Sequence, residues 1–132
     1  MLVHLNDVLP QARSGGYAVG LFNALDTEMA RGVIGAAEKL RAPVIVGTAE
    51  VLLPSSPLEN VADVLLPMAR RASVPVVVHY DHGLTFEKCM EALKLGFTSI
   101  MYDCSTEGYE ENVRKVAEMT RIAHAFGATV EA

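Results

Sequence analysis

Five consecutive residues near the middle of the chain combine the side chains that acid–base or metal chemistry needs. The sequence His-Tyr-Asp-His-Gly at residues 79–83 ends an apolar run that starts at Val74. Side chains alternate along a strand, so His79 and Asp81 share one face and His82 begins the loop that follows. A carboxylate can exchange protons with a substrate, and a neutral imidazole nitrogen can bind a metal ion.

Each of these residues also has a plainer interpretation. Asp81 acts as a general acid or base, orients a histidine, or only caps the following helix. His82 binds a metal or is simply exposed. Burying ionisable groups at the end of a strand costs free energy, which favours a functional role for this pair. His79 is interpreted as a core histidine or as a partner that supports a ligand.

Three further polar residues lie at or near the ends of other predicted strands. Asn23 either caps the helix that begins near Asp26 or hydrogen-bonds a substrate hydroxyl. Asp103 is either a turn or helix-entry residue or part of a polar site. The role of Glu131 depends on the residues that follow it.

Five runs rich in Val, Ile and aromatic residues alternate with helical segments, and they position these side chains. Their starts lie about 25 to 30 residues apart, the length of a strand, a helix and two short loops, which predicts parallel strands. The predicted strands cover residues 17–22, 43–46, 74–79, 98–102 and 128–130. The predicted helices cover residues 6–13, 27–40, 57–71, 86–95 and 110–126.

Capping residues support these helix boundaries. Asp26, Ser56 and Thr85 each precede a predicted helix, and Ser56 is followed by Pro-Leu-Glu in the pattern of a capping box. Gly96 and Gly127 follow the ends of two helices, where a left-handed residue is common.

The placement of the polar residues favours a barrel over an open sheet. A (β/α)₈ barrel gathers function at the carboxyl ends of many successive strands, whereas an open doubly wound sheet concentrates it at one switch point. The sequence therefore predicts a single α/β domain over residues 1–132, comprising the first four to five β/α units of a (β/α)₈ TIM barrel.

Composition narrows the class of partner. The chain has 132 residues, 51% hydrophobic and 20% charged, and a net charge of −5, which argues against nucleic acid as a partner. No apolar run approaches the roughly 20 residues of a membrane helix, so no membrane partner and a cytoplasmic location are expected.

Cys89 and Cys104 lack metal or redox spacing and are predicted to be buried, reduced thiols.

Five segments, in this order, resemble the class II fructose- and tagatose-bisphosphate aldolases, the zinc-dependent ketose-bisphosphate aldolases. They are residues 17–23, 41–46, 76–83, 97–103 and 127–132, and the His-x-Asp-His-Gly motif is the most specific. The resemblance covers the whole chain.

The resemblance implies a role for each candidate residue. Asp81 is the catalytic acid or base that exchanges a proton with the aldehyde-derived oxygen, and His82 is one of three histidine ligands of a catalytic Zn²⁺. Asn23 lies near the substrate, and Asp103 and Glu131 are carboxylates assigned to the metal site. The implied reaction is reversible cleavage of a ketose bisphosphate to dihydroxyacetone phosphate and an aldehyde, in a homodimer or homotetramer.

Two departures from the family pattern leave alternatives open. Ala49 stands where many members have a phosphate-binding serine, so the preferred ketose bisphosphate is open. The family continues beyond residue 132 with two more zinc histidines and a glycine-rich phosphate loop. We therefore expect the chain to be part of a longer enzyme. The alternatives are an inactive half-barrel that self-assembles or pairs with a partner, and a phosphosugar barrel with other chemistry.

Overall fold

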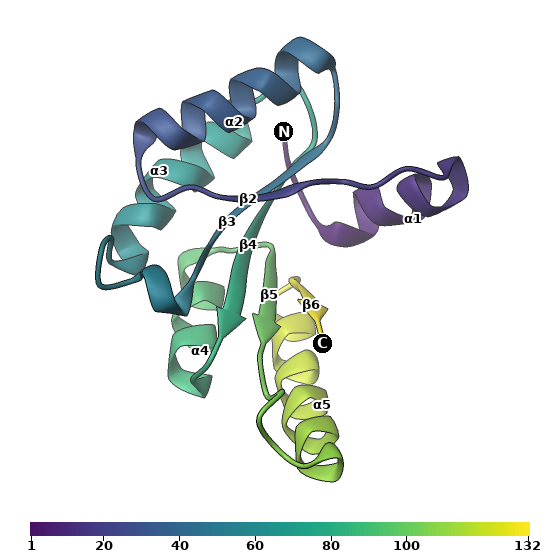
Figure 1. Cartoon of the computed structure of the whole chain (residues 1–132), viewed down its shortest axis with the longest axis vertical. Helices are drawn as coiled ribbons and strands as arrows, with labels where there is room; N and C mark the ends of the chain where they lie inside the picture. Colours follow the sequence, from purple (N-terminus) through teal and green to yellow (C-terminus); the bar gives the residue numbers. More distant parts are fainter.

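A six-stranded parallel sheet runs through the computed structural model, which describes all 132 residues (Figure 1). Its strands are β1 (Leu2–Val3), β2 (Leu21–Asn23), β3 (Val44–Ala49), β4 (Val76–Gly83), β5 (Ser99–Tyr102) and β6 (Thr129–Glu131). The helices are α1 (Leu5–Gly15), α2 (Thr27–Leu40), α3 (Leu58–Arg71), α4 (Phe86–Leu95) and α5 (Tyr109–Ala125), with a short 3₁₀ helix η1 (Glu50–Leu52) after β3.

The order of the strands identifies the type of α/β fold. Neighbours in the sheet follow the order β2-β3-β4-β5-β6, and every pair is parallel. A doubly wound sheet would reverse its order at a switch point, and no reversal occurs here. This uniform winding confirms the predicted architecture, the first units of a (β/α)₈ barrel.

The sheet has an outer face covered by helices and an inner face covered only in part. Val46, Val78 and Tyr80 belong to the larger apolar cluster, which also includes buried residues of α2, α3, α4 and α5. Ile45 and Val77, on the opposite face, form a second cluster with residues of α1. Since α1 covers one end of the inner face, the other end is free for polar side chains.

Local capping signals account for the starts of α2 and α4 and for the end of α4. The Asp26 carboxylate accepts a hydrogen bond from the Met29 N–H at 2.8 Å, and the Thr85 hydroxyl accepts one from the Lys88 N–H at 3.4 Å. Gly96, at φ 100°, has the left-handed backbone that ends α4. These predicted caps are confirmed.

The predicted cap of α3 is wrong. The Ser56 hydroxyl donates a hydrogen bond to the Leu25 carbonyl at 3.1 Å, and Pro57 precedes the helix without a side-chain cap. The serine is thus used to join the loop after β2 to the start of α3. Only the tertiary arrangement reveals this use.

Two strand predictions also differ from the structure. The first predicted strand, residues 17–22, begins only at Leu21, where the register with Ile45 of β3 starts. Before it, the Gly20 carbonyl accepts the Ile45 N–H at 3.0 Å, while the Tyr17 N–H bonds the Ala12 carbonyl of α1 instead of a strand. Strand β1 was not predicted. It pairs Leu2 with Val76 and Val3 with Val77, and two residues are too short to show a periodic pattern.

Close approach of β3 and β4 depends on Gly47, which lies beside His79 in the register. A Cβ atom at this position would lie 2.1 Å from the His79 carbonyl oxygen, so the β4 backbone would have to move. We expect Gly47→Ala to lower the free energy of unfolding by about 3 kcal/mol. Urea denaturation of the full-length protein measures this change.

The matched control for this substitution is Gly35→Ala in α2, where a Cβ atom would meet nothing within 4 Å. Alanine in a helix interior is expected to raise stability by about 0.5–1 kcal/mol. Equal stability of the Gly47→Ala variant and the wild type would show that the two strands tolerate a wider spacing.

The two cysteines agree with the sequence. Cys89 and Cys104 are both buried and form no disulfide, as predicted. Burial raises the pKa of the Cys89 thiol to about 12. None of the five helices is both long enough and apolar enough to cross a bilayer.

Candidate active site

Strand register places polar side chains in two layers at the open end of the inner face. Residues that are paired in register on neighbouring strands project to the same face. The layer nearer the middle of the strands contains Asn23, Gly47, His79, Ser99 and Thr129. The layer nearer their carboxyl ends contains Ala49, Asp81, Met101 and Glu131.

A bulge in β4 brings Asp81 and His82 to the same end of the sheet. Tyr80 pairs with Ile100 and Gly83 pairs with Tyr102, so two residues of β4 lie opposite one residue of β5. His82 has φ 44°, a left-handed conformation that is uncommon for a residue with a side chain. The prediction that His82 begins the loop is therefore wrong, because His82 lies within β4.

Asp81 occupies the centre of the polar cluster. One carboxylate oxygen, Oδ2, accepts a hydrogen bond from Asn23 Nδ2 at 3.4 Å. The other oxygen, Oδ1, lies 3.9 Å from His79 Nε2 and 4.0 Å from His82 Nε2. The Asp81 side chain is 18% exposed, so the carboxylate has solvent access and free lone pairs with which to meet a substrate proton.

His82 is held through one of its ring nitrogens. Its Nδ1 lies 2.6 Å from Asp103 Oδ2, and this hydrogen bond raises the pKa of His82. Hydrogen bonds with His82 and Ser105 lower the pKa of Asp103 to about 2. Because the side chain of His82 is 54% exposed and its Nδ1 is engaged, Nε2 is the nitrogen left free to bind a ligand.

His79 is buried and neutral beneath Asp81. Its Nδ1 lies 2.8 Å from Ser99 Oγ, while its Nε2 is buried without a hydrogen-bond partner. Burial lowers the pKa of His79 to about 4. The 3.6 Å approach of its Nε2 to Glu131 Oε2 is therefore not an ion pair at neutral pH. Asn23 Oδ1 is likewise buried without a partner, so the site holds unused polar atoms.

All five residues singled out in the sequence lie at this end of the sheet: Asn23, Asp81, His82, Asp103 and Glu131. Asp103 has two contacts: its Oδ1 accepts the Ser105 N–H at 3.0 Å, as in a turn, and its Oδ2 lies 2.6 Å from His82 Nδ1. No group of three or more His, Cys, Asp or Glu side chains is arranged to hold a metal ion.

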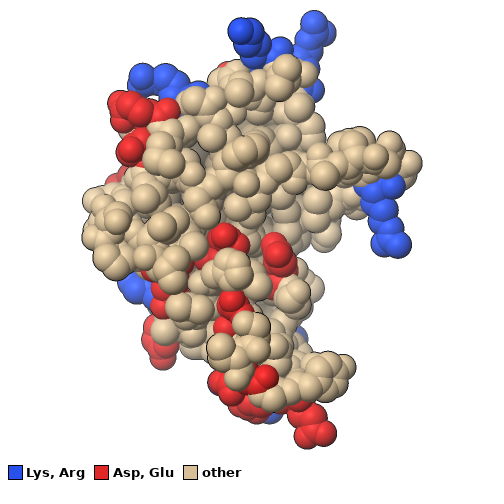
Figure 2. All heavy atoms as spheres, viewed as in Figure 1, with Lys and Arg blue, Asp and Glu red and all other residues tan.

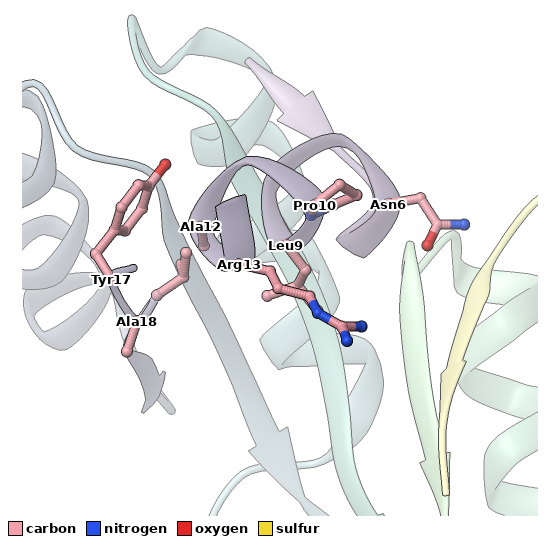
Figure 3. Close-up of a pocket in the computed structure, with 8 residues that line it drawn as sticks. Asn6, Leu9, Pro10, Ala12, Arg13, Tyr17 and Ala18 are labelled. Carbon is pink, nitrogen blue, oxygen red and sulfur yellow. The ribbon is translucent and has the colours of Figure 1, made fainter. Parts of the chain in front are cut away.

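The largest pocket lies elsewhere, between α1 and the segment that follows it. It measures about 590 Å³ and is lined mainly by apolar side chains, including Leu9, Pro10 and Tyr17 (Figure 3). Its only ionisable groups are Arg13 and the Tyr17 phenol. This pocket lacks the carboxylates and imidazoles of the β4 cluster, so size alone does not indicate the site.

Charge is distributed unevenly over the face seen in Figure 2. Acidic side chains are most numerous in its lower half, over the region of β4, β5 and α5, with a smaller acidic group at the upper left, while most basic side chains project from the upper end and from α1. A site in this acidic region would attract a cation, whereas an anion would need a bound metal ion or backbone N–H groups to offset the negative charge.

Sequence reasoning missed Glu50, the first residue of η1. Its carboxylate accepts hydrogen bonds from Tyr80, Leu84 and Thr85, on both sides of the bulge. Glu50 stands in no recognisable motif and is followed by Val-Leu-Leu. No signal in the sequence could have connected it with residues about 30 positions away.

Comparison with known proteins agrees with this geometry. Residues 3–132 match the family model described as "Fructose-bisphosphate aldolase class-II". The chain is 40% identical over 132 residues to a fructose-bisphosphate aldolase of Thermus caldophilus, covering 100% of this chain and 43% of that protein. It is 39% identical to one of Geobacillus stearothermophilus over 134 residues, covering 99% and 47%.

Solved structures give the same answer for the fold. The crystal structure of the YdjI aldolase from Escherichia coli K12 superposes with a TM-score of 0.96 at 35% identity, covering 100% of this chain and 52% of that one. The chain thus spans about half the length of the proteins that it matches. With the family model matched over almost every residue, the chain belongs to the class II fructose-bisphosphate aldolase family.

Proposed function

We propose that the full-length protein is a zinc-dependent aldolase that reversibly cleaves a ketose bisphosphate. The substrate is fructose or tagatose 1,6-bisphosphate, and the products are dihydroxyacetone phosphate and glyceraldehyde 3-phosphate. One observation carries the proposal: an accessible carboxylate, Asp81, and a free imidazole nitrogen, His82 Nε2, lie 4.0 Å apart at the open end of the sheet. Relatives named fructose-bisphosphate aldolase support it.

The donor atoms fit one corner of a zinc site. Zinc prefers imidazole nitrogen among its ligands, and a ligating histidine usually donates its other N–H to a carboxylate. His82 and Asp103 have this arrangement. When bound, zinc would supply a Lewis acid to the reacting carbonyl group. His82 would hold it together with ligands from the rest of the full-length protein.

The proton transfer falls to Asp81. In the cleavage direction, the carboxylate takes the proton from the hydroxyl whose oxygen becomes the aldehyde as the carbon–carbon bond breaks. In the condensation direction it returns that proton. Asn23 fixes one oxygen of Asp81 through its amide and has a free, buried Oδ1 that suits a substrate hydroxyl. His79, neutral and buried, supports the carboxylate without competing for the proton.

Glu131 and Asp103 complete the proposed site as carboxylates near the metal. Asp103 acts through His82, and Glu131 lies beside His79 on the same face. We further propose that the protein works in the cytoplasm as a homodimer or homotetramer. The family resemblance supports both of these proposals.

Elemental analysis and a cleavage assay test the proposal together. We expect about one zinc ion per full-length chain, cleavage of fructose or tagatose 1,6-bisphosphate, loss of turnover on treatment with a chelator, and recovery on adding Zn²⁺. Borohydride in the presence of substrate should leave the enzyme active, since no Schiff base forms. A protein that binds sugar phosphates without cleaving them would instead be a barrel with other chemistry.

A further inference from the structure

We propose that Glu50 is a positioning residue, whose carboxylate fixes the backbone of the bulge that carries Asp81 and His82. This inference rests on the proposed function, because it assigns Glu50 a part in that same site. Glu50 is partly buried and contacts neither a substrate position nor His82 directly. It acts through the chain segments on either side of the bulge.

Four hydrogen bonds converge on this one carboxylate. Oε2 accepts the Tyr80 hydroxyl at 3.1 Å, the Leu84 N–H at 2.8 Å and the Thr85 N–H at 3.1 Å. Oε1 accepts the Thr85 hydroxyl at 3.0 Å. All four partners donate, so the position requires an acceptor with two oxygens and suits an ionised carboxylate.

The donors stand immediately before and after the residues of the site. Tyr80 precedes Asp81, and Leu84 and Thr85 follow Gly83. One side chain therefore holds both ends of residues 81–83. It reaches them from η1, directly after Ala49, which pairs with Asp81 in the register. The carboxylate also lies at the start of α4, where the helix dipole favours negative charge.

The bulge needs such a constraint because its backbone is unfavourable on its own. His82 has φ 44°, and the pairing of β4 with β5 is interrupted between Tyr80 and Gly83. A left-handed residue with a side chain persists only where the surrounding structure determines it. Without the Glu50 bonds, residues 81–83 are free to relax toward a regular strand, which would turn His82 away from Asp81.

The chain provides a matched control in Glu38. Its carboxylate accepts the Ser73 N–H at 2.7 Å and the Ser73 hydroxyl at 3.0 Å, and so it also ties a loop next to β4. That loop lies at the opposite, amino-terminal end of the strand. If substituting Glu50 lowered activity only by weakening a loop next to β4, the same substitution at Glu38 should lower activity equally.

The test compares Glu50→Gln with Glu38→Gln in the full-length protein. Glutamine keeps the size of the side chain but presents an amide N–H₂ to the donors that surround Glu50. In Glu50→Gln we expect kcat and zinc affinity to fall by about tenfold or more, with KM changed by less. In the zinc-free protein labelled with ¹⁵N-histidine, the His82 backbone amide signal should shift. Glu38→Gln should leave all these quantities at wild-type values.

Tyr80→Phe is the gentler variant, because it removes one of the four donors and keeps the ring. If Glu50→Gln does not fold, Tyr80→Phe becomes the deciding variant. We expect it to show smaller losses of kcat and zinc affinity and a smaller shift of the His82 amide signal. The inference is overturned if the deciding variant keeps the wild-type His82 signal and zinc affinity, or if Glu38→Gln reproduces the losses.

Failure of the proposed function gives a different pattern. In that case the wild-type protein itself would lack zinc and cleavage activity. The His82 amide signal of the zinc-free variants still reports whether Glu50 sets the backbone, independently of any activity.

Discussion

Asp81→Ala in the full-length protein, the proposed aldolase, is expected to lower kcat by about a thousandfold or more, while zinc stays bound. Asp81 is the only carboxylate that lies within about 4 Å of both His79 and His82. The substitution removes the proposed acceptor of the hydroxyl proton but leaves His82 and its bond to Asp103 in place. Steady-state cleavage assays and elemental analysis of the same preparation measure the two quantities.

Two comparison variants show whether the loss is chemical. Asp81→Asn keeps the shape and the bond to Asn23 but cannot take a proton, so it should be as inactive as Asp81→Ala. Asp63→Ala removes an exposed carboxylate of α3 and should leave kcat unchanged. Retained turnover in either Asp81 variant would exclude this residue from the proton transfer.

His82→Ala is expected to abolish both zinc binding and turnover. A catalytic zinc is usually held by three protein ligands, and His82 supplies the free Nε2 that this chain can offer. Loss of one ligand should leave the dialysed protein without metal and therefore without the Lewis acid. Zinc content after dialysis, measured together with cleavage, checks this result.

The contrast between the two variants is as informative as either alone. Zinc should remain in Asp81→Ala and leave in His82→Ala, although the two residues are adjacent. His124→Ala, at the last turn of α5, is the histidine control and should keep zinc and activity. A His82→Ala protein with full zinc content would mean that the metal is held by other residues.

Features encoded over short stretches of sequence could be predicted. The alternation of strands and helices follows from apolar periodicity, and the caps at Asp26 and Thr85 are local hydrogen bonds. The shared face of His79 and Asp81 follows from strand alternation alone. Because parallel strands end at one edge, Asn23, Asp81 and Asp103 were also expected to meet.

Features that depend on distant partners could not be predicted. Ser56 has the pattern of a helix cap, yet its hydroxyl is taken by the Leu25 carbonyl of another loop. The bulge at Asp81 and His82 exists only relative to β5, and Glu50 gains its role from donors about 30 residues away. In each case, tertiary contacts override a local preference or supply one where the sequence has none.

The left-handed backbone at His82 limits which residue types this position can accept. Valine, isoleucine and threonine suffer most in that conformation, whereas asparagine and aspartate tolerate it best after glycine. Because we propose His82 as a zinc ligand, a change of ligand type at this position would meet the least backbone resistance with aspartate, which offers oxygen in place of nitrogen. Oxygen ligands suit Mg²⁺ and Mn²⁺ better than zinc. Under the proposed function, the left-handed backbone at His82 would thus bias which metal ions a substituted site could come to prefer.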